Sequence, residues 1–228
     1  MIELQPRDRQ ILNLAYEQQF VTMKQIETWV FSEQTKRRAN QRILALERSG
    51  LLKSELPQVG FQSRIIRLTR SGIKVAETDR AERIPQVKRI SIQTLLHDSF
   101  VTAVRLRLGE LWNAAWIPER LLKAEQFAQI PDGLLVFPSG ATVAIEVENT
   151  PKGPKRFREI QERWRGSSVK LCLYVATSDV MFRVVKSYLL AGPRDLPFGV
   201  VNWRDLEAGT PEVFMAAGEI NIFTRREL

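Results

Sequence analysis

Residues 51–72 have the sequence LLKSELPQVGFQSRIIRLTRSG, and this stretch decides the fold of the first third of the chain. Residues 51–56 and 61–69 each have the composition of a β-strand, and the Pro-Gln-Val-Gly segment between them has that of a turn. Thr69 is a good N-cap for a short helix over 70–77. The stretch therefore predicts a β-hairpin followed by a helix.

Three helices are predicted ahead of the hairpin, over residues 6–17, 23–31 and 33–49. Each shows apolar residues at the spacing of one helical face. Thr22 and Ser32 can cap the second and third helices, and Gly50 follows the third helix as a typical C-terminal residue.

The helix predicted over 33–49 has two contrasting faces. Ala39, Ile43 and Leu46 cluster on one side of a helical wheel, and the other side carries basic and amide side chains, namely Gln34, Arg37, Arg38, Gln41 and Arg48. Arg can bond bidentately to guanine and Gln to adenine, and both can contact phosphate. This face therefore suits DNA recognition, and it equally suits a solvated helix surface.

The net charge is unevenly distributed along the chain. The 228 residues include 34 Lys or Arg and 26 Asp or Glu, which gives +8. Residues 1–90 hold 17 basic and 10 acidic residues, an excess of +7, and residues 91–228 hold 17 and 16. This asymmetry favours contact between the first part and a polyanion.

Three helices, a hairpin and the phrase Leu68-Thr-Arg-Ser-Gly72 resemble a winged-helix DNA-binding domain, which we assign to residues 1–80. The resemblance implies that the helix over 33–49 enters the major groove. It also implies that the hairpin tip at 58–62 and Arg64 contact the DNA backbone or minor groove. Winged helices are used for protein–protein contacts too, so an adaptor without a nucleic-acid role is the open alternative.

A second domain is predicted over residues 91–228, after a polar linker at 81–90 that contains Pro85. Its pattern predicts an α-β-β-β-α-β order followed by a further helix and strand. The helices are expected at 91–111, 153–164 and 180–190, and the strands at 114–118, 132–137, 141–148, 169–177 and 198–203.

Pro131-Asp132 and Glu146-Val147-Glu148, separated by thirteen residues, resemble the PD-(D/E)XK nuclease motif, whose fold core has the same αβββαβ order. The resemblance implies that Asp132 and Glu146 bind Mg²⁺, with Glu125 as an extra carboxylate. The sequence departs from the motif at its Lys position, where Glu148 stands.

Three interpretations of Glu148 are open. Lys152 or Lys155 could return an ammonium group to the site from the next helix, since the lysine stem is long and flexible. Glu148 could instead be a third metal-binding carboxylate. In the third interpretation, the fold persists as an inactive scaffold for dimerisation or partner contacts.

The combination of both domains resembles the replication-relaxation family of bacterial and plasmid proteins. It implies an α+β protein that binds double-stranded DNA as a regulator or accessory factor in replication or in a mobile element. We expect a homodimer, with other replication or mobile-element proteins as further partners, and no cofactor unless the nuclease interpretation brings Mg²⁺. The sequence shows no apolar run of membrane-spanning length and no signal peptide, so we expect a cytoplasmic protein without membrane contact.

Overall fold

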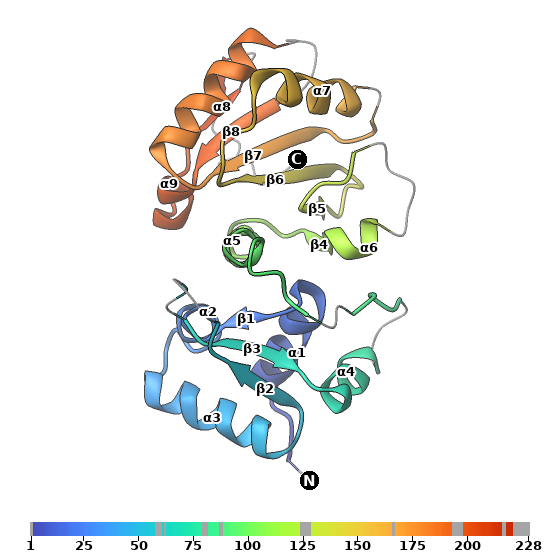
Figure 1. The fold of residues 1–228 in the computed structure, drawn as a ribbon, viewed down its shortest axis with the longest axis vertical. Helices are drawn as coiled ribbons and strands as arrows, with labels where there is room; N and C mark the ends of the chain where they lie inside the picture. Colours follow the sequence, from blue (N-terminus) through green and yellow to red (C-terminus); the bar gives the residue numbers. More distant parts are fainter. Residues whose placement is uncertain are drawn as a thin grey trace. The chain divides into compact units, whose positions relative to one another are not determined.

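The computed structural model describes residues 2–57, 61, 63–78, 82–86, 89–123, 129–165, 167–192, 198–215 and 218–220. The chain is a mixed α+β protein, as predicted, and it forms two compact units, Met1–Thr102 and Ala103–Leu228. Figure 1 shows the elements of each unit. Within the described ranges, no helix has the length and apolar character needed to cross a bilayer.

Unit 1 contains helices and a small antiparallel sheet with the strand order β1-β3-β2 among its described residues. Its elements are α1 (Pro6–Gln18), β1 (Val21–Thr22), α2 (Met23–Gln25), the π-helical turn η1 (Ile26–Val30), α3 (Lys36–Arg48), β2 (Leu52–Glu55), β3 (Ile65–Leu68) and α4 (Arg70–Glu77). The hairpin and the helices predicted over 6–17 and 70–77 are confirmed.

The second and third helices differ from their predictions. The segment predicted as one helix over 23–31 is a single α-helical turn that continues as η1. Helix α3 begins at Lys36 because Thr35, and not Ser32, is its N-cap, with its Oγ1 accepting a hydrogen bond from the Arg38 amide at 3.3 Å.

The Leu-Thr-x-x-Gly phrase forms a tight corner between the hairpin and α4. The Thr69 hydroxyl accepts a hydrogen bond from the Gly72 amide at 3.1 Å and donates to the Gly50 carbonyl at 2.5 Å. A Cβ atom at position 72 would overlap the carbonyl oxygen of Leu51. Gly72 is therefore needed for close packing, and Thr69 ties the start of α4 to the end of α3.

Helix α3 is fixed to α1 by a buried ion pair. The side chain of Asp8 is 0% exposed, and its oxygens accept bonds from Arg42 Nε at 2.9 Å and Nη2 at 2.5 Å. The Gln5 amide also donates to Asp8, at 2.7 Å. The hydrogen bond to Asp8 raises the pKa of Arg42, so the guanidinium stays charged.

Part of the segment predicted as a linker packs on α1. Ile84 is 3% exposed, and its amide donates to the Tyr16 hydroxyl at 3.0 Å. Unit 1 continues into α5 (Leu95–Leu111), where the Ser99 carbonyl accepts a hydrogen bond from Gln25 at 2.8 Å. The division between the two units thus falls inside this helix.

Unit 2 is built on a sheet of seven described strands in the order β10-β9-β8-β7-β6-β5-β4. Strands β6, β7 and β8 are parallel, and the flanking pairs are antiparallel. The elements after α5 are β4 (Ala115–Pro118), α6 (Glu119–Leu122), β5 (Gly133–Val136), β6 (Thr142–Glu148), α7 (Pro154–Trp164), β7 (Leu171–Ala176), α8 (Asp179–Ala191), β8 (Phe198–Asn202), α9 (Trp203–Ala208), β9 (Val213–Met215) and β10 (Gly218–Ile220). The predicted strands and helices are present, and α6, α9, β9 and β10 were not predicted.

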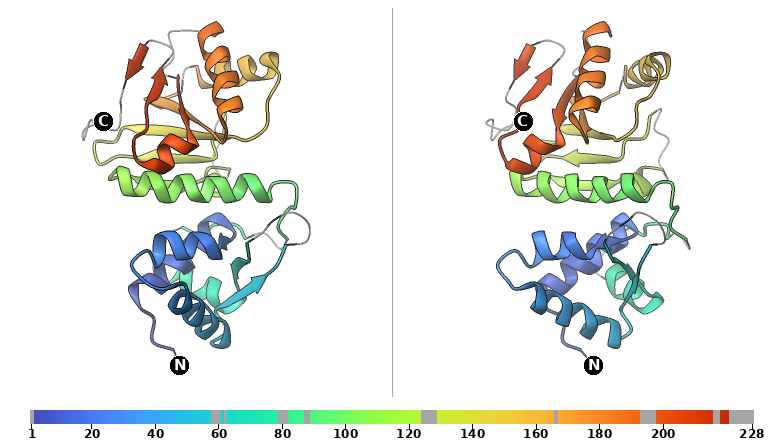
Figure 2. Two further views of the ribbon diagram at one scale, coloured as in Figure 1. Left: turned by 90° about the vertical axis from the view of Figure 1, so that its left-hand side faces the viewer. Right: turned by 60° about the vertical axis from the view of Figure 1, so that its left-hand side comes forward.

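Helices α7 and α8 cover one face of this sheet (Figure 2). Phe157 and Trp164 from α7 and Val185 from α8 form a buried cluster with Cys172 and Tyr174 of β7. Tyr174 pairs in register with Glu146 of β6, so the two side chains project to the same face. The acidic residues of β6 therefore lie on the face that α7 and α8 cover.

The Asp8–Arg42 pair predicts a large cost for removing its cation. Arg42→Met would leave a buried carboxylate without its cationic partner, so we expect a loss of about 3–5 kcal/mol in the free energy of unfolding. Urea unfolding measures it. Arg48→Met, at an exposed position of the same helix, is the control and should change stability by less than about 0.5 kcal/mol. Equal effects of the two substitutions would contradict this role of the pair.

Candidate functional site

Helix α3 turns the predicted basic face outward. Ala39, Ile43 and Leu46 are 0% exposed, so they fix the inner side of the helix. Of the residues predicted to bind DNA, Arg37, Arg38, Gln41 and Arg48 are exposed and Gln34 is half-buried. The structure thus brings five of the six predicted side chains onto one segment with access to solvent.

Leu44 lies in the middle of this face and was not predicted as a site residue. It is 41% exposed, and it is one of several exposed large apolar side chains among the described residues. The positions 37, 41, 44 and 48 follow each other at helical spacing, so they form one stripe. That spacing is the signal that could have identified Leu44 from the sequence.

Arg64, the sixth predicted residue, makes contacts within unit 1. Its guanidinium donates to Asn40 Oδ1 of α3 at 2.9 Å and lies 3.4 Å from the sulfur of Met23. The Asn40 amide in turn donates to the Lys36 carbonyl at 2.9 Å. Arg64 therefore connects the start of β3 with α3, and its predicted DNA contact stays a prediction. Most of the predicted hairpin tip, at 58–60 and 62, lies outside the described residues.

Four candidate residues of unit 2 gather at the carboxyl end of β6, namely Asp132, Glu146, Glu148 and Lys152. Gly133 pairs with Ile145 in the antiparallel β5–β6 ladder, which places Asp132 beside Glu146. Asp132 Oδ2 accepts a hydrogen bond from the Val147 amide at 2.7 Å, so the carboxylate is held against β6. Carboxyl ends of parallel strands are the usual location of binding sites in α/β sheets.

Glu148 and Lys152 form an ion pair at the same end of the strand. Glu148 is 3% exposed, and its carbonyl accepts a bond from the Thr177 amide at 3.0 Å. The carbonyl of Lys152 accepts a bond from the Tyr188 hydroxyl of α8 at 3.1 Å. The ammonium of Lys152 thus lies at the Glu148 carboxylate, and which of the three interpretations of Glu148 holds stays a prediction.

The surroundings of Glu146 raise the pKa of its carboxyl group. Burial raises the pKa of this carboxyl well above its usual value of 4.5, and the nearby charge of Asp132 raises it further. The ammonium of Lys152 and a hydrogen bond from Gln129, at 3.4 Å, oppose this shift. Burial also raises the pKa of Cys172 and of Tyr174, which are neighbours on β7.

The cluster fits Mg²⁺ only through a small ligand set. No group of three or more His, Cys, Asp or Glu in the described part of the chain is arranged to hold a metal ion, and Glu125 lies outside that part. Asp132 and Glu146 are adjacent carboxylates, and Mg²⁺ is commonly bound by one or two carboxylates together with water and substrate phosphate. These two residues are therefore the ligands that the cluster can offer.

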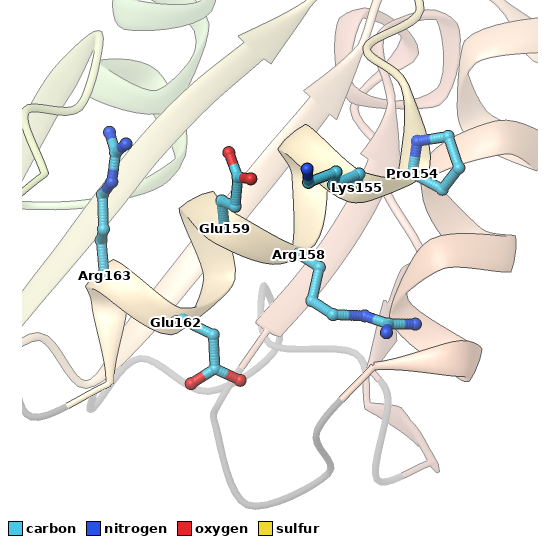
Figure 3. Close-up of a pocket in the computed structure, with 6 residues that line it drawn as sticks. All are labelled: Pro154, Lys155, Arg158, Glu159, Glu162 and Arg163. Carbon is cyan, nitrogen blue, oxygen red and sulfur yellow. The ribbon is translucent and has the colours of Figure 1, made fainter.

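The basic residues of α7 are interleaved with acids. A cavity of about 630 Å³ beside this helix is lined by Pro154, Lys155, Arg158, Glu159, Glu162 and Arg163. Figure 3 shows Glu159 projecting between Lys155 and Arg163 along one row of the helix. Glu162 also pairs with Arg165 at 2.9 Å. This alternation resembles a solvated helix surface more than a phosphate track.

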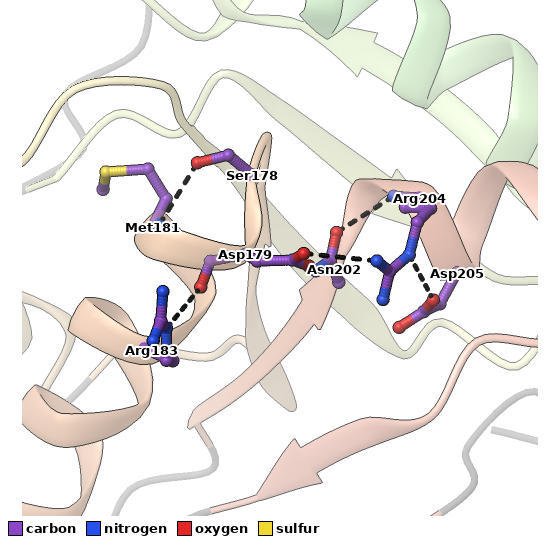
Figure 4. A network of polar contacts seen from close by, with 7 residues as sticks. All are labelled: Ser178, Asp179, Met181, Arg183, Asn202, Arg204 and Asp205. Atoms are coloured by element: carbon purple, nitrogen blue, oxygen red, sulfur yellow. Dashed lines mark hydrogen bonds and ion pairs between the residues drawn. The ribbon is translucent and has the colours of Figure 1, made fainter.

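A second polar network lies at the carboxyl end of β8 (Figure 4). Asn202, which is 4% exposed, donates to Asp179 Oδ1 at 2.5 Å and accepts from the Arg204 amide at 3.0 Å. Arg204 also pairs with Asp179 at 3.2 Å. These bonds join the starts of α8 and α9, so the network is accounted for by the fold.

Comparisons with known protein families, with curated proteins and with solved structures find no match to this chain.

The raised pKa of Glu146 predicts a pH-dependent effect of Glu146→Gln. The folded state holds this proton more tightly than the unfolded chain, so wild-type stability falls as pH rises above the usual glutamate value through the raised one. Glutamine does not titrate. In a metal-free buffer, we expect the melting temperature of the variant, relative to wild type, to increase between about pH 5 and pH 8. The corresponding gain in the relative free energy of unfolding is about 1.4 kcal/mol for each unit by which the pKa is raised.

Glu159→Gln, an exposed acid on α7, is the matched control and should show no such trend. A pH-independent difference between Glu146→Gln and wild type would contradict the electrostatic account.

Proposed function

We propose that this protein binds double-stranded DNA through unit 1, which acts as a winged-helix domain. The order of its elements and the β1-β3-β2 sheet support the assignment, since they agree with the resemblance noted in the sequence. Helix α3 would enter the major groove, and the β2–β3 hairpin would lie beside the backbone. The family resemblance would place this activity in plasmid replication or in a mobile element.

One observation carries the proposal, namely the outward face of α3. Arg37, Gln41 and Arg48 project from it without acidic neighbours on the same stripe. Arginine and glutamine are the side chains that bond bidentately to guanine and adenine. Leu44 adds an apolar surface, which suits contact with the methyl group of thymine.

Replacing Arg37 and Arg38 by Ala tests the proposal. The affinity for a duplex selected by the wild-type protein should fall by about 1–3 kcal/mol for each base-specific hydrogen-bonding pair that the substitutions remove. Fluorescence anisotropy at several salt concentrations measures both the affinity and the salt slope, and wild-type binding should weaken with a slope of about −0.9 for each neutralised phosphate.

Lys74→Ala removes a basic side chain from α4, away from the stripe on α3, and serves as the control. If the double variant folds and retains wild-type affinity for the selected duplex, α3 is not the recognition element.

A Mg²⁺-dependent DNA endonuclease or nickase is the second candidate function, and the position of Asp132 beside Glu146 favours it. Asp132 and Glu146 would hold the ion, which when bound orients a water molecule and offsets charge on the scissile phosphate. Glu148 fixes the ammonium of Lys152 at the edge of the same cluster, where it can contact a phosphate oxygen. Without this activity, unit 2 would serve for dimerisation or partner contacts.

Supercoiled plasmid incubated with Mg²⁺ or Mn²⁺ tests the second function. Cleavage by the wild type should be abolished in Asp132→Asn, which keeps an oxygen for the Val147 amide but removes the charge. Glu159→Gln should cleave as the wild type does. Intact plasmids of several sequences in both metals would eliminate the nuclease.

A further inference from the structure

A polar cleft of about 440 Å³ lies beside α3 within unit 1. Its lining comes from the first turn of α1 and from the segment 31–45, and consists of Gln5, Arg7, Phe31, Gln34, Arg38, Gln41, Arg42 and Ala45. Three of these residues are arginines and none is acidic. The cleft therefore carries a concentrated positive charge. The sequence pattern indicates the basic face of α3 but not this cleft.

Two of the three arginines supply charge that no acid in the lining offsets. Arg42 is paired with the buried carboxylate of Asp8, so its charge is balanced internally. Arg7 and Arg38 have no carboxylate beside them in the lining, and this pair of guanidinium groups makes the cleft suitable for binding an anion.

Both guanidinium groups are held in place by neighbouring side chains. The guanidinium carbon of Arg7 lies 5.1 Å from the centroid of the Phe31 ring, which is a cation–π distance. Arg38 Nη1 donates to Gln34 Oε1 at 2.8 Å. These contacts reduce the side-chain freedom that binding would otherwise remove, so the site is partly preorganised.

The cleft also adjoins the surface proposed to contact DNA. Arg38 and Gln41 line the cleft and belong to the outward side of α3. A duplex whose major groove receives α3 carries one of its two backbones along the flank of that helix. The backbone on the α1 side would then pass the cleft.

We propose that Arg7 and Arg38 together bind one backbone phosphate of the duplex in this cleft. This inference rests on the proposed DNA-binding function and adds α1 to its interface. Guanidinium forks bond bidentately to phosphate oxygens, and such contacts set the orientation of a protein on DNA without reading its sequence. Arg7 would therefore increase affinity equally for all sequences, whereas the stripe on α3 would discriminate among them.

Arg7→Ala should weaken binding to the selected duplex about tenfold and to an unrelated duplex by the same factor. The salt slope should become less steep by at most about 0.9, the value for one phosphate contact, because Arg38 remains beside that phosphate. Arg7→Lys keeps the charge but not the fork, so it should restore the slope and only part of the affinity. Lys74→Ala, on α4, is the charge-matched control.

Duplexes with a single methylphosphonate locate the phosphate. One neutralised phosphate should weaken binding by the wild type more than binding by Arg7→Ala, because the variant contacts that phosphate through Arg38 alone. Melting temperatures of the variants establish that each is folded.

Two results would overturn the inference, and they are distinguishable. If the wild type binds no duplex at all, the proposed DNA-binding function fails and this contact fails with it. If the wild type binds and Arg37→Ala is impaired, but Arg7→Ala keeps the wild-type affinity and salt slope, DNA binding stands and the cleft holds no phosphate.

Discussion

The carboxylate of Asp8 is fully buried between α1 and α3, and a charge in that position needs a cation within bonding distance. Arg42 supplies it from the middle of α3. Because Arg42 must point towards α1, the rotation of the whole helix about its axis is set, and Arg37, Gln41 and Arg48 are left on the outside. The buried pair thus decides which face of α3 is available to a partner, together with the apolar residues beneath the helix.

The same constraint has a different outcome in unit 2. Glu148 is paired with Lys152, but Glu146 lies between two acidic neighbours, Asp132 and Glu148, with one ammonium nearby. The protein therefore keeps an excess of negative charge beneath α7. A proton on Glu146 relieves this excess, and a divalent cation would relieve it too. Asp8 is paired with one cation, whereas an ionised Glu146 would lie beside two other carboxylates.

Local signals predicted much of the fold. Three of the predicted features depend on residues close together in the chain. They are the N-cap at Thr69, the helix over 6–17, and the strand–turn–strand that brings Asp132 beside Glu146. Some elements have too few residues for a periodic pattern, namely the two-residue β1, the short strands β9 and β10, and the short helices α6 and α9. Their existence depends on the rest of the sheet being in place.

Side-chain partners were less predictable than elements. Asp8 and Arg42 are 34 residues apart, and Arg64 and Asn40 are 24 apart, so no local spacing indicates either pair. The bond between Arg64 and Asn40 bears on the role of Arg64, which was predicted to contact DNA from the β2–β3 hairpin. An arginine guanidinium has five N–H donors, so the bond from Arg64 Nη2 to Asn40 leaves other donors for a ligand. The same guanidinium joins the start of β3 to α3, so a displacement of Arg64 would also act on Asn40. Arg64 is therefore placed to couple the hairpin with α3.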